Sequence, residues 1–108
     1  MLPNRMQNTL ISFVLPAFKS EFLEQAINSI LNQTYENFEL IIVNDCSPDN
    51  VEEIVYSFKD KRIKYYENEK NIGGTNLIDN WNLCTRFANG EYLILASDDD
   101  IYSPDFLM

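Results

Sequence analysis

The stretch that decides the fold is Tyr92-Leu-Ile-Leu-Ala-Ser-Asp-Asp-Asp100. Its four apolar residues, 92–95, predict a central strand that is buried on both faces of a sheet. Three carboxylates follow, and adjacent like charges repel, so they could not be buried without a partner. Mg²⁺ and Mn²⁺ favour carboxylate ligands and leave positions for substrate phosphates. The stretch therefore predicts a metal–diphosphate site at the carboxyl end of a strand, with a solvated acidic turn as the alternative.

The overall composition excludes several classes of function. The chain has 108 residues, of which 45% are apolar, and this suits one small domain with a hydrophobic core. Its net charge of −9 argues against binding to nucleic acid or to an acidic membrane surface, since both attract lysine and arginine. The chain has no histidine, so neither a histidine base nor a Ser-His-Asp triad is available within it.

The cysteines and the chain ends give expectations about location and extent. Cys46 and Cys84 lack metal-type spacing, and we expect buried, reduced thiols in a cytoplasmic protein. No apolar run approaches the roughly 20 residues of a transmembrane helix, although a later part of the protein could attach to a membrane peripherally. A helix is expected to begin near 106–108, so we interpret 1–108 as a single partial domain that is truncated at its C-terminus.

Strand-like and helix-like segments alternate along the chain. Strands are expected at 9–15, 38–43, 63–67 and 92–95, and helices are expected after Ser20, after Asn50 and from about Leu77. Such alternation predicts an α/β fold of Rossmann-like type, with a mostly parallel sheet and helices on both faces. The third strand is shorter and more polar, which favours a position near an edge.

Several single residues predict where these elements begin or end. We expect Pro16 to end the first strand and Ser20 to be the N-cap of the first helix. Asn50 and Glu53 have the spacing of a capping box. Gly90 fits the position just after the third helix, where a left-handed backbone is common.

The carboxyl ends of the strands carry the candidate functional residues, and in a parallel sheet these ends meet along one rim. Phe18 could stack on a planar heterocycle, Asp45 could accept a hydrogen bond from a ring N–H, and the aspartates could hold a ribose hydroxyl and a metal. Alternatively, Phe18 packs in the core, 45–49 is only a turn that starts a helix, and Gly73-Gly74 is a plain turn. The sequence contains no GxGxxG, Walker A or EF-hand pattern.

Five segments together resemble family 2 glycosyltransferases, specifically the N-terminal, nucleotide-sugar-binding half of their GT-A fold. The resemblance runs from about Thr9 to the last residue. It is carried by Pro16-Ala-Phe18, Ser29-Ile-Leu-Asn-Gln-Thr-Tyr-Glu-Asn-Phe-Glu39, Asn44-Asp-Cys-Ser-Pro-Asp49, Asn71-Ile-Gly-Gly74 and Gly90-Glu-Tyr-Leu-Ile-Leu-Ala-Ser-Asp-Asp-Asp100.

The resemblance implies roles for these residues. The aromatic ring of Phe18 would stack on uracil, Asp45 would pair with the uracil ring, and the acidic motif would bind the ribose and a Mn²⁺ or Mg²⁺ that bridges the diphosphate. The predicted substrate-binding residues are Pro16, Phe18, Asp45, Gly74 and Asp98, and the predicted metal ligands are Asp99 and Asp100.

Four positions depart from the family pattern. Relatives commonly have Asn at the position of Lys19, Asp at Asn44 and Arg at Asp79. Ala96 stands where an Asp-x-Asp motif would begin, so the acidic motif is shifted onto Asp98 and the residues that follow it.

The resemblance implies transfer of a sugar from a nucleotide-sugar, expected to be a UDP-sugar, to a hydroxyl of a saccharide or lipid-linked acceptor. In inverting relatives a carboxylate base in the second half of the domain deprotonates the acceptor. That base would lie beyond Met108, so no catalytic residue is predicted here and this part alone would be inactive. Two alternatives are a non-catalytic metal- and nucleotide-binding module and, with less support from the acid spacing, a receiver-like signalling domain.

Overall fold

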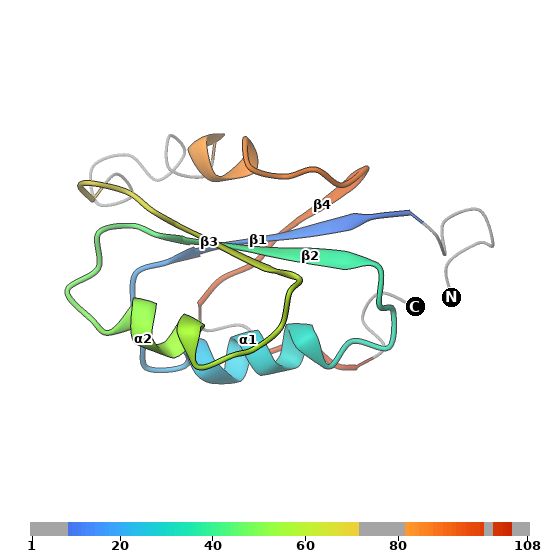
Figure 1. The fold of residues 1–108 in the computed structure, drawn as a ribbon, viewed down its shortest axis with the longest axis horizontal. Helices are drawn as coiled ribbons and strands as arrows, with labels where there is room; N and C mark the ends of the chain where they lie inside the picture. The colour runs from blue at the N-terminus through green and yellow to red at the C-terminus, as the bar shows by residue number, and fades with distance from the viewer. Residues whose placement is uncertain (1–8, 72–81, 99–100, 105–108) are drawn as a thin grey trace.

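A four-stranded parallel sheet organises the chain. The computed structural model describes residues 9–71, 82–98 and 101–104. Its strands are β1 (Ile11–Ala17), β2 (Phe38–Asn44), β3 (Ile63–Glu67) and β4 (Tyr92–Leu95), in the spatial order β3-β2-β1-β4, and its helices are α1 (Leu23–Leu31) and α2 (Val51–Tyr56). In Figure 1, α1 and α2 cover one face, and the helical residues 82–85 lie over the other. This arrangement confirms the predicted α/β class.

Alternating residues of the two inner strands build a core on each face. Toward α1 and α2, the core contains Phe13 and Leu15 of β1 together with Leu40 and Ile42 of β2, all fully buried. On the other face, Val14, Ile41 and Val43 pack with Cys84 and with the partly buried Phe87. The long apolar runs of β1 and β2 are explained by this burial on both sides.

β4 differs from the prediction of a central strand buried on both faces. It pairs only with β1, so among the described residues it forms an edge of the sheet. Tyr92, Leu93 and Leu95 are 49%, 44% and 39% exposed. The prediction was wrong because an apolar run does not specify how many neighbours a strand has. β3 forms the other edge, as expected.

Pro16 does not end β1 but lies inside it, opposite Val43 of β2. Val14 accepts a hydrogen bond from Ala96, so alternate residues of β1 turn their backbone groups toward the side of β4. The pairing of β4 with β1 stops opposite Val14, so β4 does not reach Pro16. Although Pro16 has no N–H to donate, the sheet therefore loses no hydrogen bond there.

The expected helix signals are used differently in the structure. Ser20 is not the N-cap of α1, which is Phe22, and the N–H of Ser20 instead donates to Asp49 Oδ2 at 3.0 Å. Asn50 is the N-cap of α2, but its side chain makes no capping hydrogen bond, so the capping box with Glu53 does not form. At Ser20, hydrogen bonds to the distant Asp49 stand in place of the expected local cap.

Gly90 and Cys46 also differ from expectation. The φ angle of Gly90 is not positive, so its backbone does not need the freedom of a left-handed glycine. A Cβ at Gly90 would lie 2.6 Å from Ser12 Oγ and 2.7 Å from the carbonyl oxygen of Leu10, so close approach to β1 explains the glycine. Cys84 is buried as expected, but Cys46 is exposed.

No helix among residues 9–71, 82–98 and 101–104 has the length and hydropathy of a membrane span.

Candidate functional site

The loop that follows β1 is attached to the end of β4. The backbone N–H groups of Phe18 and Lys19 both donate to Asp98 Oδ2, at 3.0 and 2.9 Å. Asp98 therefore fixes the backbone of the aromatic loop, while the Phe18 ring itself is 39% exposed. An exposed ring on a fixed backbone is suited to stacking against a planar ligand.

The same loop is attached on its other side to the segment between β2 and α2. The hydroxyl of Ser47 donates to the carbonyl of Phe18, and the carboxylate of Asp49 accepts from the backbone of Ser20. Ser47 is itself oriented by its N–H, which donates to Asn44 Oδ1 at 2.9 Å. The β1 loop is thus held between the ends of β4 and β2.

Asp45 connects the ends of three strands. Its N–H donates to the carbonyl of Ala17 at 2.9 Å, and its side chain is almost fully buried. Asp45 Oδ1 accepts from Asn68 Nδ2 at 2.9 Å, and the Asp45 carbonyl accepts from Asn71 Nδ2 at 3.1 Å. These bonds anchor the segment after β3 to the end of β2, beside the aromatic loop.

Asn44 occupies a position where relatives were expected to have Asp, and its contacts require an amide. Its Oδ1 accepts from Ser47, while its Nδ2 donates to the hydroxyl of Tyr65 at 3.0 Å. Tyr65 in turn donates to Glu67 Oε1 at 2.8 Å. A carboxylate at position 44 could not donate to Tyr65, so this departure matches the local hydrogen bonding.

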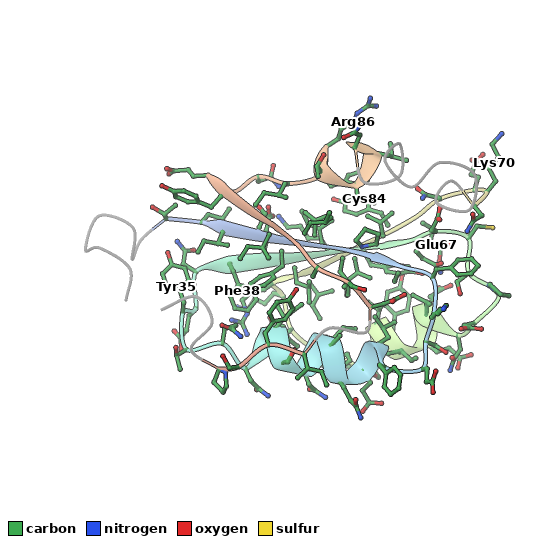
Figure 2. The ribbon with its side chains drawn as sticks, turned by 180° about the vertical axis from the view of Figure 1, so that it is seen from behind. Tyr35, Phe38, Glu67, Lys70, Cys84 and Arg86 are labelled. Atoms are coloured by element: carbon green, nitrogen blue, oxygen red, sulfur yellow. The ribbon has the colours of Figure 1, made fainter. Side chains whose placement is uncertain are left out.

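Cys84 lies beneath this rim, on the face of the sheet opposite α1 and α2. Figure 2 shows it between the helical turn and the sheet. Burial, together with the negative charge of Asp45, raises the pKa of the Cys84 thiol to about 11. The thiol is therefore protonated at neutral pH and is not a nucleophile.

An acidic cleft of about 500 Å³ lies beside the rim, between β2, α2 and β3. Its lining includes five carboxylates, which are Asp49, Glu52, Glu53, Glu67 and Glu69. Glu67 raises the pKa of the adjacent Glu52 through a hydrogen bond between the two carboxyl groups. A diphosphate would be repelled from such a lining, so this cleft does not suit an anionic ligand.

The structure brings together four of the predicted site residues. Pro16, Phe18, Asp45 and Asp98 lie at the carboxyl ends of β1, β2 and β4. Gly74, Asp99 and Asp100 are outside the described residues, so their predicted roles stay predictions. Sequence reasoning missed Ser47 and Asn68. Both residues could have been considered from the sequence, because each follows the carboxyl end of a predicted strand. Their hydrogen-bond partners could not be predicted, because those partners are distant in the sequence.

Only Asp98 of the acidic motif that is predicted to bind a divalent cation lies among the described residues. Among the described residues, no group of three or more His, Cys, Asp or Glu side chains is arranged to hold a metal. Asp98 is, however, a carboxylate at the rim, directly before Asp99 and Asp100. Hard oxygen ligands of this kind suit Mn²⁺ or Mg²⁺, and binding of the ion by Asp99 and Asp100 stays a prediction.

Comparison with known proteins identifies the family. The model of the glycosyl transferase family 2 matches residues 12–108. The chain therefore belongs to this family, and the predicted membership is confirmed.

Two relatives and one solved structure show the extent of the similarity. The chain is 39% identical to the uncharacterized glycosyltransferase RC0461 of Rickettsia conorii, over 95% of this chain and 17% of that protein. It is 34% identical to the Escherichia coli UDP-Glc:alpha-D-GlcNAc-diphosphoundecaprenol beta-1,3-glucosyltransferase WfgD, over 90% of this chain and 38% of that protein. The chain thus spans less than half of these relatives.

The crystal structure of Staphylococcus aureus TarS 1–349 in complex with UDP matches with a TM-score of 0.80 and 29% identity. The match covers 90% of this chain and 29% of TarS. The fold of the described residues is therefore that of the N-terminal part of a GT-A glycosyltransferase, as the resemblance implied.

Proposed function

We propose that the protein containing this chain transfers a sugar from a UDP-sugar to a hydroxyl group of a saccharide or lipid-linked acceptor. Residues 1–108 form the donor-binding part of its catalytic domain. The transfer depends on Mn²⁺ or Mg²⁺ and inverts the configuration of the sugar. The acceptor base is a carboxylate outside this chain.

The observation that carries this proposal is the pair of hydrogen bonds from Phe18 and Lys19 to Asp98. They join the aromatic loop to the start of the acidic motif across 80 residues of sequence. A base that stacks on Phe18 would therefore have its diphosphate within reach of the aspartates. A solvated acidic turn would not require such a connection.

The rim residues supply complementary contacts to a uridine nucleotide. Phe18 offers a ring face, and Asp45 offers a buried carboxylate acceptor for the imide N–H of uracil. Pro16 lies at the end of β1, just before the aromatic loop, and Asp98 accepts from a ribose hydroxyl in this proposal. Gly74, outside the described residues, is assigned to donor binding from the resemblance alone. The relatives support uridine as the base, since WfgD is named for UDP-Glc and TarS was crystallised with UDP.

Asp99 and Asp100 would hold the cation, which when bound would supply positive charge against the leaving diphosphate. This chain's own contribution is to orient the nucleotide and to hold the carboxylates close to the diphosphate. The chain carries a surplus of acidic groups, including those that line the cleft beside β2 and β3. Because these groups repel an anion, a diphosphate would bind more weakly without a cation than with one. This charge distribution supports the proposal that nucleotide binding depends on a metal.

Calorimetric titration of the full-length protein tests the proposal. UDP, GDP and TDP are titrated with and without Mn²⁺. We expect UDP to bind only with the metal and more tightly than GDP. Absent or metal-independent UDP binding by a folded sample would contradict the proposal. A UDP-sugar that binds but is not transferred to any acceptor would favour the non-catalytic module instead.

A further inference from the structure

Glu39 is a buried carboxylate with a complete set of hydrogen-bond donors. Its side chain is 4% exposed. Oε2 accepts from Ser12 Oγ and from the N–H of Asn89, each at 2.6 Å. Oε1 accepts from Lys64 Nζ at 2.8 Å and from Asn89 Nδ2 at 3.3 Å. Removing such an acceptor leaves several donors without their partner.

These contacts attach the segment before β4 to the amino ends of β1 and β2. Ser12 donates its hydroxyl proton to Glu39 and accepts from the N–H of Gly90 at 2.7 Å. We call this set the amino-end junction. It consists of Ser12, Glu39, Lys64, Asn89 and Gly90.

β4 needs such a junction because burial specifies its register only weakly. Three of its four side chains are exposed, and only Ile94 is partly buried. A slip of one residue would exchange the two faces of the strand, and little buried apolar area opposes it. At the amino-end junction, by contrast, only a glycine fits at position 90, since a Cβ there would meet Ser12 and Leu10 within 2.8 Å.

The register of β4 decides where Asp98 lies. β4 pairs with β1 from Tyr92 opposite Ile11 to Leu95 opposite Val14. The N–H of Ala96 then donates to the carbonyl of Val14 at 2.8 Å, and Asp98 follows two residues later. A shift at the amino end of β4 would therefore move Asp98 relative to the backbone of the aromatic loop.

We propose that Glu39 is a positioning residue of the donor site: through the amino-end junction it fixes the register of β4 and so places Asp98 against Phe18 and Lys19. The proposal rests on the proposed function, because it assigns the remote carboxylate a role in donor binding. Glu39 touches neither nucleotide nor metal. It lies at the amino end of the sheet, and the donor site lies at the carboxyl end.

The test uses the full-length protein and three variants. Glu39→Gln removes the charge and one acceptor from the amino-end junction. Ser12→Ala removes the bridging hydroxyl but keeps the ion pair of Glu39 with Lys64, and it carries the test if Glu39→Gln does not fold. Glu36→Gln, at an exposed position three residues away, is the control for the loss of one negative charge.

Two quantities are measured, which are the UDP affinity with Mn²⁺ and the amide hydrogen exchange of separate peptides. We expect Glu39→Gln and Ser12→Ala to weaken UDP binding by roughly tenfold or more, since small displacements of a positioned group cost this much. Exchange should accelerate at 89–91 and at 18–19, while peptides from α2 keep their protection. Glu36→Gln should match the wild type in both measurements.

Wild-type UDP affinity and wild-type protection at 18–19 in both variants would overturn the positioning role. Uniformly faster exchange in all peptides would overturn it as well, since that result indicates only a general loss of stability. If the wild type itself does not bind UDP with Mn²⁺, the proposed function fails. The exchange at 18–19 then still decides whether Glu39 positions the end of β4.

Discussion

β2 and β4 are both apolar strands of the same parallel sheet, but they are held in place by different interactions. All seven residues of β2 are buried, whereas three of the four residues of β4 are exposed. β2 has its register fixed by side chains packed on both faces. Carboxylates hold the segments on either side of β4: Asn89, before its start, donates to Glu39, and Asp98, after its end, accepts from Phe18 and Lys19. Stability should therefore depend on β2 side chains, and site geometry on the polar contacts around β4.

The largest difference between the two strands should appear in side-chain truncations. Ile42→Ala in β2 removes a fully buried side chain from the core against α1 and α2, and it should cost about 2–5 kcal/mol of unfolding free energy. Leu95→Ala in β4, 39% exposed, should cost about 1 kcal/mol or less. Urea denaturation of both variants measures the two values. Equal losses would mean that β4 is buried in the folded protein.

The next effect should come from the charge on Glu39. Burial alone would raise its pKa, but hydrogen bonds from Lys64, Ser12 and Asn89 outweigh burial and lower the pKa to about 2. This shift from 4.5 corresponds to stabilisation on the order of 3 kcal/mol.

Because the folded-state pKa of Glu39 is depressed, its stabilisation is present above the unfolded pKa and is lost as the pH falls toward 2. The unfolding free energies of wild type and Glu39→Gln should therefore differ most at neutral pH and converge in acid. Urea denaturation at pH 7, 4 and 2.5 follows the difference. A difference independent of pH would exclude the charge of Glu39 as its source.

Gly90→Ala should disturb the start of β4 by steric overlap. The added methyl group would lie 2.6 Å from Ser12 Oγ, 2.7 Å from the carbonyl oxygen of Leu10 and 2.8 Å from the backbone nitrogen of Ser12. The two backbone atoms cannot move without displacing the start of β1. We expect a loss of about 1–3 kcal/mol, typical of overpacking. Thermal unfolding measures it. Asn89→Ala is the informative comparison, since it adds no atoms and removes one side-chain hydrogen bond to Glu39.

The smallest effect should come from an ion pair near the other edge strand, β3. Asp60 and Arg62 pair at 2.7 Å with partly exposed side chains, and the hydrogen bond from Arg62 lowers the pKa of Asp60. Asp60→Asn should cost no more than about 1 kcal/mol, and less in high salt. Denaturation at two salt concentrations checks this. If Asp60→Asn lowered the unfolding free energy as much as Glu39→Gln does, burial would not explain the different contributions of the two carboxylates to stability.

Strand positions could be predicted from the sequence because they depend on local apolar runs. The bounds of β3 and β4 match the expected ones, and those of β2 differ by one residue. The exposure of β4 could not be predicted, since it depends on which strands lie beside it. β1 extends through Pro16 for the same reason, because the backbone on the β4 side of that residue has no ladder partner.

The rim of the candidate site was predictable, but its internal connections were not. Parallel strands place Phe18, Asp45 and Asp98 along one edge whatever the details of the loops. The partners of these residues come from distant segments, as when Ser47 contacts the carbonyl of Phe18 and Asn68 contacts Asp45. The Ser20 cap was a wrong prediction because α1 begins two residues later, after Phe22, while the N–H and the hydroxyl of Ser20 donate to the distant Asp49.

A crystal structure of the full-length protein with UDP and Mn²⁺ would show directly whether the rim binds the donor. We expect the uracil ring against Phe18 with its imide N–H toward Asp45, and the diphosphate and metal beside residues 98–100. The nucleotide in the acidic cleft between α2 and β3, or Asp98 detached from the backbone of Phe18 and Lys19, would contradict it.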